Sequence, residues 1–395
     1  MSTIETQRIH ALDGLRGTAL LLGVVFHAIL TFMPGDQPFW FIMDPSRSEF
    51  LAGTGWFLHI FRMTLFFLLA GYFGRMLMER EGLKGFAKNR VMRIVVPFGA
   101  FWWIIFLAVI SIFLWGFAVQ NGGEIPADAP PPPPLSVHNV PLTHLWFLYL
   151  LILLYAGLVG MRALLNLVGL SRPLSAIYDA IQGRLLATPF MPFILAVPTG
   201  LAFMAHQHWA PWFGIPTPDY GLFPNTTALI AYGSAILVGW NMHRIPNLVF
   251  KLEKVWMING AIAIVLSGYA LSIVGVQPSW GTPLPEQEKM IYVICYALSI
   301  WFWTFALIGA ALKFWQKESA VRRYIADASY WVYIIHLPIV MALQVALYHW
   351  SLAAELKVIL ILLISTPLMF LSYHYLVRYT ALGKFLNGRK RTRSA

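Results

Sequence analysis

The stretch that decides the fold class is Ala11-Leu-Asp-Gly-Leu-Arg-Gly-Thr-Ala-Leu-Leu-Leu-Gly-Val-Val-Phe-His-Ala-Ile-Leu30. Its apolar run is long enough to cross the hydrocarbon core of a bilayer as a helix. Arg16 lies near one end, and His27 follows at a distance of about 16 Å along the helix axis. Because ionisable side chains are costly in hydrocarbon, His27 is a candidate functional residue. The alternatives are a structural hydrogen bond from His27 to a neighbouring helix and an interfacial position for Arg16.

The composition excludes an ordinary soluble domain. The chain has 395 residues, of which 58% are hydrophobic and 11% are charged, so it lacks the polar residues that would cover a soluble surface. The net charge of +11 would suggest a nucleic-acid partner in a soluble protein, but the basic residues follow a membrane-topology pattern. We therefore expect an integral membrane protein that contacts the lipid bilayer and binds no nucleic acid.

Apolar runs of membrane-spanning length recur along the chain, and we count about ten of them. Since a backbone in lipid must satisfy its own hydrogen bonds and these runs are too long for barrel strands, we expect helices. We predict an all-α integral membrane protein, a single polytopic domain over residues 1–395 with a basic tail at 377–395. The fifth and sixth runs are short for a full crossing. The predicted spans are Leu12–Met33, Thr54–Met76, Val91–Val119, Leu142–Met161, Phe190–Ala205, Thr226–Met242, Val255–Val274, Met290–Leu312, Ala328–His349 and Leu356–Val377.

The distribution of lysine and arginine predicts the orientation. With the N-terminus in the cytoplasm, the inner loops and the tail hold almost all of the basic residues, as the positive-inside rule requires. We therefore predict that both termini are cytoplasmic. The basic residues that fall elsewhere are Arg47, Arg62, Lys289 and Lys357.

The second span contains His59 and Arg62, which are three residues apart and share a helix face. Both enter from the outer side and should reach a depth similar to that of His27. An arginine at that depth needs a partner or a water-filled cavity. The alternative is an arginine that extends outward to the interface beside a structural histidine.

Two further histidines lie in or near the membrane. His144 opens the fourth span, and His336 lies well inside the ninth span, where Pro338 is expected to kink the helix. Each histidine alone is consistent with a structural role. Together with His27, His59 and Arg62, however, they indicate a polar cavity within the bundle.

A pair of arginines, Arg90 and Arg93, lies at the inner mouth of the third span. The positive-inside rule alone can explain basic residues at this position. The functional alternative is a phosphate clamp, because a guanidinium group presents a fork of donors that matches phosphate oxygens.

At this point several motifs together resemble the membrane acyltransferase-3 family. They are scattered over most of the chain and keep the family's order. The motifs are Arg16-x10-His27, Phe66-Phe-x-x-x-Gly71-Tyr-Phe, Arg90-x-x-Arg93, His144-x-Trp146 and Ser329-Tyr-x-x-Tyr-x-x-His336-x-Pro338.

The resemblance implies a ten-helix inner-membrane enzyme that takes an acyl group from cytoplasmic acyl-CoA and delivers it to a carbohydrate on the other side. It implies a catalytic role for His27 and functional roles, including CoA binding, for Arg16, Arg90 and Arg93. One departure is Ala70, where the family usually has serine. Weaker motifs, such as Leu382-Gly-Lys-Phe-Leu-Asn-Gly388, resemble the group associated with succinylating periplasmic glucans.

The chemistry of the residues agrees with this implication. A neutral imidazole can take the proton of a sugar hydroxyl as the hydroxyl attacks a thioester, so we predict His27 as the general base. Either Arg62 or His144 is predicted to stabilise the oxyanion. Asp13 is expected to favour the helix N-terminus or to orient Arg16. We assign substrate binding to His59, Trp146, Tyr330 and His336.

The predicted function is therefore O-acyl transfer in a bacterial inner membrane. We expect succinyl-CoA or acetyl-CoA as the donor substrate, a periplasmic glucan or other polysaccharide as the acceptor, no permanently bound cofactor and no metal site. Two alternatives stay open. One is O-acetyl transfer to another surface polysaccharide, and the other is a transporter that uses the histidines as a proton relay.

Overall fold

The computed structural model describes residues 3–35, 40–124, 134–170, 180, 184, 188, 190–244, 246–280 and 283–388. Over these ranges the regular structure is helical, which confirms the predicted all-α class. The end of the predicted basic tail, residues 389–395, lies outside the described residues. The helices are α1 (Thr3–Ile29), α2 (Glu49–Arg90), α3 (Val96–Gln120), α4 (Trp146–Leu167), α6 (Met191–Ala205), α7 (Thr226–Arg244), α8 (Pro246–Val274), α9 (Glu286–Phe314), α10 (Ala320–Ala346), α11 (Ala354–Ser372) and α12 (Ala381–Asn387).

Short helical segments extend or connect these helices. A single 3-10 turn, Leu30–Phe32, follows α1, and two others are Thr143–Leu145 before α4 and Pro211–Phe213. Two segments have the wider π-helical winding, Val91–Val95 before α3 and Tyr373–Arg378 after α11. Such segments often mark functional positions, and the first of them contains Arg93.

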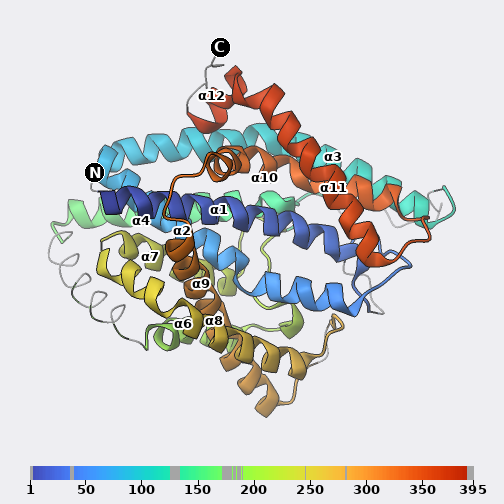
Figure 1. Cartoon of the computed structure of the whole chain (residues 1–395), viewed down its shortest axis with the longest axis horizontal. Helices are drawn as coiled ribbons and strands as arrows, with labels where there is room; N and C mark the ends of the chain where they lie inside the picture. Colours follow the sequence, from blue (N-terminus) through green and yellow to red (C-terminus); the bar gives the residue numbers. More distant parts are fainter. Residues whose placement is uncertain are drawn as a thin grey trace.

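Each of the ten predicted spans coincides with a helix. In the described chain, however, seven helical stretches, rather than ten, are long and apolar enough to cross a membrane. One of them, Glu49–Gln120, has 72 residues. Its length of about 108 Å far exceeds the roughly 30 Å of a hydrocarbon core. The chain folds back inside α2, where Gly82 breaks the helix with a φ of 69°, and the part after Gly82 continues through Val91–Val95 into α3 (Figure 1). This stretch therefore contains two of the predicted spans. The number of crossings and the orientation of the termini stay predictions.

Helix α1 runs through the middle of the bundle (Figure 1) and packs against α2, α9, α10 and α11. Around this centre, α2 packs along α7 with unusually close backbones. A Cβ atom at Gly71 would clash with the carbonyl of Ile236, and one at Gly239 would clash with the carbonyl of Leu68. Small residues at helix crossings permit this approach in membranes. The Gly71 of the Phe-Phe motif is thus a packing residue of the α2–α7 pair.

A buried ion pair ties the start of α11 to the segment after α1. Lys357 and Asp44 are 0% and 1% exposed, and Lys357 Nζ lies 2.7 Å from Asp44 Oδ2. Asp44 also accepts a hydrogen bond from the backbone N–H of Ser46, which in turn donates from its hydroxyl to the carbonyl of Leu352. Lys357, which the orientation analysis placed outside the inner loops, is therefore a structural residue.

Candidate active site

His27 lies in the last turn of α1, where the helix tightens into the 3-10 turn. The turn is held from α10, because Gln344 Nε2 donates to the carbonyl of His27 at 2.8 Å. Trp40 Nε1 donates in turn to Gln344 Oε1 at 3.0 Å. The His27 ring is half-buried, and its Nδ1 has no hydrogen-bond partner within the described chain. The backbone of His27 is thus fixed, and its side chain lines the cavity described below.

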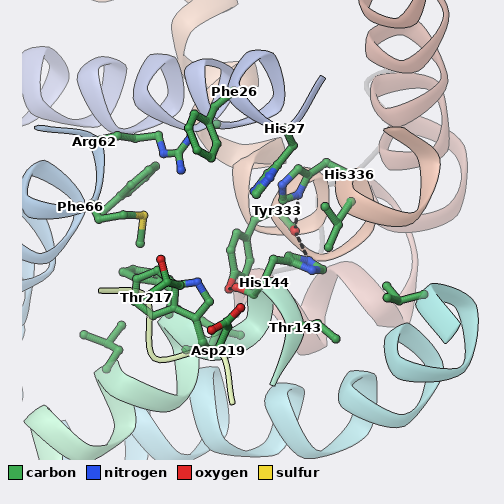
Figure 2. Close-up of a pocket in the computed structure, with 18 of the residues that line it drawn as sticks. Phe26, His27, Arg62, Phe66, Thr143, His144, Thr217, Asp219, Tyr333 and His336 are labelled. Carbon is green, nitrogen blue, oxygen red and sulfur yellow. Dashed lines mark hydrogen bonds between the residues drawn. The ribbon is translucent and has the colours of Figure 1, made fainter. Parts of the chain in front are cut away.

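Three histidine rings meet at this position (Figure 2). The His336 ring, from α10, lies 5.1 Å from the His27 ring and 4.9 Å from the His144 ring, centroid to centroid. His144 and His336 are 6% and 4% exposed. The structure therefore brings together three of the four histidines that the sequence suggested.

Pro338 explains how His144 is anchored. Proline has no N–H, so the carbonyl of Ile334, four residues earlier in α10, loses its helical donor. His144 Nε2 occupies the vacancy, at 3.1 Å from the Ile334 oxygen and 3.0 Å from the Tyr333 oxygen. The Tyr333 hydroxyl donates back to the carbonyl of His144 at 2.6 Å. The proline thus creates the acceptor that positions the His144 ring.

These contacts define the ring tautomers. A carbonyl oxygen only accepts, so the proton of neutral His144 is on Nε2. His336 Nδ1 lies 2.7 Å from the Tyr333 oxygen, so its proton is on Nδ1 and its Nε2 carries a lone pair. In its neutral form, His144 therefore has no second proton to donate to an oxyanion.

Arg62 and His59 lie beside this cluster, on α2. The Arg62 guanidinium carbon is 4.0 Å from the centre of the Phe26 ring, and the His59 ring stacks on the same phenylalanine at 5.3 Å. His59 Nε2 lies 2.9 Å from the carbonyl of Phe213. His59 therefore joins α2 to the loop after α6, while Arg62 points into the space that His27 and His336 share (Figure 2).

A continuous cavity of about 1970 Å³ contains these groups. His27, His59, Arg62, His144 and His336 line its middle. One end of the cavity is lined by Arg16, Arg90, Arg93, Tyr330 and Asn387, and the other by Asn139, His206, Thr217, Asp219, Tyr220 and Trp280. The histidines and Arg62 predicted to share a cavity do line one, but most of its lining is apolar, and it extends to two separate regions of the molecule.

The first end, which we call the arginine end, carries the predicted phosphate clamp. Arg93 Nη1 donates to the carbonyls of Lys384 and Phe385 in α12, at 3.0 and 2.7 Å. Gly388, with a φ of 82°, ends α12 and leaves room for the Arg93 side chain. Arg90 lies over the rings of Phe86 and Tyr155, and its Nε has no partner in the part of the chain described.

Two other predicted residues lie at the arginine end. Arg16 forms an ion pair with Asp13 at 3.1 Å, which fits the proposed orienting role of that carboxylate. Tyr330, which we assigned to substrate binding, donates from its hydroxyl to the carbonyl of Arg93 at 2.9 Å. Tyr330 therefore belongs with the arginines rather than with the histidines. Trp146 is buried against the stacked rings of Phe67 and Tyr232 and forms part of the cavity wall.

The opposite end contains a carboxylate that the sequence analysis missed. Asp219 lies in the loop before α7, and its carbonyl accepts the N–H of Leu142, which joins this loop to the segment before α4. Its side chain points toward the cavity beside Thr217 (Figure 2). Burial raises the pKa of Asp219 from 3.8 to about 6. The chain has only 17 acidic residues, so an aspartate within an aromatic-rich loop was the feature of the sequence that could have identified Asp219 as a candidate.

Thr143, directly before His144, has a strained backbone. Its φ is 53°, which is unusual for a β-branched residue. Strain of this kind is often found at functional sites. Here it directs the chain so that His144 reaches the α10 carbonyls.

Comparisons with known proteins identify the family of the chain. A family model described as an acyltransferase domain, of the acyltransferase-3 type, matches residues 9–374. The chain is 29% identical over 160 residues to the glucans biosynthesis protein C of Salmonella paratyphi B, Salmonella heidelberg and Salmonella dublin. The match covers 40% of this chain and 40% of each relative. No solved structure matches the chain.

Except for Asn387, the family match spans the residues given for both ends of the cavity and the three histidines between them. The matches to individual relatives span about two fifths of their length. The chain therefore belongs to the acyltransferase-3 family.

Proposed function

We propose that the chain is an O-acyltransferase that moves an acyl group from acyl-CoA at the arginine end of the cavity to a hydroxyl of a glucan at the Asp219 end. His27 is the general base. The observation that carries this proposal is the single cavity, because it connects a cluster of arginines, the His27 imidazole and a carboxylate lined by aromatic rings. Two substrates can thus meet at one ring without crossing the membrane themselves.

The arginine end suits the anionic part of CoA. Arg90 and Arg93 present guanidinium groups to the cavity, and the Nε of Arg90 is buried without a partner among described residues. Guanidinium forks bind phosphate with charge-assisted hydrogen bonds. With the phosphates held there, the extended arm of CoA carries the thioester along α1 toward His27. The basic-residue pattern predicts that this end faces the cytoplasm of a bacterial inner membrane.

The reaction at His27 follows from general-base chemistry. His27 takes the proton of the sugar hydroxyl, the oxygen forms a bond with the thioester carbonyl carbon, and the carbon–sulfur bond breaks. The proton then passes to the leaving thiolate, so the ring returns to its neutral form. His336, whose Nε2 carries a lone pair at the adjacent ring, can accept a hydrogen bond from a second hydroxyl of the sugar.

The acceptor end suits a carbohydrate. Asp219 can accept hydrogen bonds from sugar hydroxyls, and Tyr220 and Trp280 provide aromatic surface at the same end. The name of the Salmonella relatives, glucans biosynthesis protein C, supports a glucan acceptor. Succinyl is the leading acyl group, and acetyl transfer to another surface polysaccharide is the second candidate.

Transfer by the purified protein tests the proposal. In detergent, with labelled succinyl-CoA or acetyl-CoA and a glucan acceptor, the wild type should produce labelled glucan and His27→Gln should not. The matched control is His349→Gln, because His349 is exposed and outside the cavity lining. Full transfer by a folded His27→Gln variant would contradict the assigned base. Uptake of solute into vesicles without any acylation would favour a transporter instead.

A further inference from the structure

Helix α12 forms part of the wall at the arginine end of the cavity. Leu386 and Asn387 line the cavity there, and Leu386 is only 2% exposed. The helix lies within the motif Leu382–Gly388, to which the acyl-transfer chemistry gives no role, and it follows the residues 9–374 that the family model matches. Because α12 is part of this wall, any change in its position alters the shape of the donor entrance.

The end of α12 is held by Arg93. Its Nη1 donates to the carbonyls of Lys384 and Phe385, at 3.0 and 2.7 Å. The last carbonyls of a helix lack backbone donors and carry the negative end of the helix dipole, so a guanidinium group is a suitable partner for them. A Cβ at Gly388 would clash with Arg93 Nη2. The Arg93 guanidinium is therefore packed into the end of α12.

Two further contacts fix α12, one near each end. Near its start, a Cβ at Gly383 would clash with the carbonyl of Val377, so the helix packs tightly on the preceding turn. At its end, Asn387 Nδ2 donates to the carbonyl of Asp327 in α10, at 3.2 Å. A hydrogen bond with one charged partner is about twice as strong as a neutral one, so the two bonds from Arg93 are the stronger anchor. Loss of the Arg93 side chain should therefore loosen α12.

Arg90, the other arginine of the pair, has different partners. Its guanidinium carbon lies 5.5 and 5.4 Å from the centres of the Phe86 and Tyr155 rings, and its Nη2 donates to Oδ1 of Asn89. These partners belong to α2 and α4. The two arginines lie one helical turn apart but contact different elements, so their roles can be separated by experiment.

We propose that Arg93 is a positioning residue, which holds α12 as a wall of the donor site and acts on CoA through that helix, while Arg90 contacts the phosphates. This inference rests on the proposed function and deepens it, because it divides the arginine end into a ligand and a support. A phosphate that bound Arg93 Nη1 would have to displace two carbonyls of α12. With α12 held, Leu386 and Asn387 keep the entrance in the shape that the donor requires.

Cross-linking α12 in place separates the two roles. In a Cys295→Ser background, cysteines replace Asn387 and Asp327, whose hydrogen bond brings the two segments together, and a short, reducible bifunctional thiol reagent joins them. Equilibrium binding of CoA is measured before cross-linking, after it and after reduction, with Arg93→Met present or absent. Arg90→Met in the same background is the matched control. Gel filtration identifies a variant that fails to fold, and Arg93→Lys then replaces Arg93→Met.

Arg93→Met should weaken CoA binding by about 10-fold or more, the effect of losing a charge-assisted hydrogen bond, and the cross-link should restore most of the affinity. Arg90→Met should also weaken binding, but the cross-link should not restore it. If the cross-link fails to restore Arg93→Met, Arg93 binds the phosphate itself and the inference is overturned. If the cross-link abolishes CoA binding in the protein that keeps Arg93, α12 is a lid that must open, which also overturns the inference.

Hydrogen exchange of the α12 backbone amides provides a readout that does not depend on CoA. Exchange in residues 381–388 should be about 10-fold faster or more in Arg93→Met than in the wild type, and unchanged in Arg90→Met. Unchanged exchange in Arg93→Met would overturn the inference and leave the proposed function intact. Faster exchange in a protein that binds no CoA would refute the proposed donor, while the support of α12 by Arg93 would stand.

Discussion

Replacing Pro338 by alanine tests how the histidine cluster is held. The new N–H at residue 338 can donate to the carbonyl of Ile334, which His144 Nε2 now uses at 3.1 Å. Helix α10 gains a backbone hydrogen bond, while His144 keeps only its bond to the Tyr333 oxygen, at 3.0 Å. The variant should therefore be more stable than the wild type and less active.

The magnitudes follow from the two changes. Removing a proline from inside a helix stabilises the fold by about 3 kcal/mol. Losing one of the two His144 hydrogen bonds destabilises it by about 1 kcal/mol. The unfolding free energy should therefore rise by about 2 kcal/mol. A displacement of about 1 Å at a catalytic group can lower a rate by up to 100-fold. His144 does not take the proton itself, so we expect a loss of about tenfold.

The assay pairs thermal unfolding with the rate of acyl transfer. The matched control is Pro367→Ala in α11, since Pro367 is also inside a helix but does not line the described cavity. Pro367→Ala should raise stability without lowering the rate. If Pro338→Ala keeps full activity, or if both variants lose activity equally, the proline does not position His144 and the reasoning is refuted.

Three further predictions concern the fold and the acceptor end. Lys357→Met leaves the buried Asp44 carboxylate unpaired and should lower the unfolding free energy by about 3–5 kcal/mol. Adding Asp44→Asn should recover part of this loss. An unchanged unfolding temperature in Lys357→Met would show that the pair is not structural. Gly239→Ala should destabilise the α2–α7 contact by about 1–3 kcal/mol, whereas Gly268→Ala, which meets open space, should not, and equal unfolding temperatures would contradict the close approach. Because the folded protein raises the pKa of Asp219 from 3.8 to about 6, its contribution to stability is present below pH 3.8 and is lost as pH rises through about 6. Asp219→Asn should remove that fall from the unfolding temperature, and an unchanged pH profile would contradict the buried carboxylate.

The helical fold was predictable from the sequence because lipid permits little else. Uninterrupted apolar runs can satisfy their backbones only as helices, and each predicted run is helical. The number of membrane crossings was less predictable, because the length and apolarity of a run do not show where the chain turns. The reversal at Gly82 occurs inside a stretch that is helical by hydrogen bonding, and it depends on a backbone conformation available to glycine.

The site was partly predictable. Ionisable residues in apolar spans are rare, so His27, Arg62 and His336 were visible from the sequence alone, and the structure places them around one cavity. Their partners were not visible. The group that joins His144 to His336 is the backbone carbonyl of Tyr333, which a side-chain motif does not reveal. The Asp44–Lys357 pair joins residues far apart in the chain, which spacing does not reveal. Tyr330 was grouped with His336 because both belong to one motif, but six residues of helix separate them and carry Tyr330 to Arg93.

The central claim is that one cavity brings both substrates to His27, and labelling a cysteine at that position tests it most directly. The protein contains one cysteine, so a Cys295→Ser background allows His27→Cys to be the single target. In sealed vesicles, a small membrane-impermeant thiol reagent should modify this cysteine from either side, and CoA should block the modification from the arginine end. A cysteine that stays unmodified from one or both sides would contradict the account.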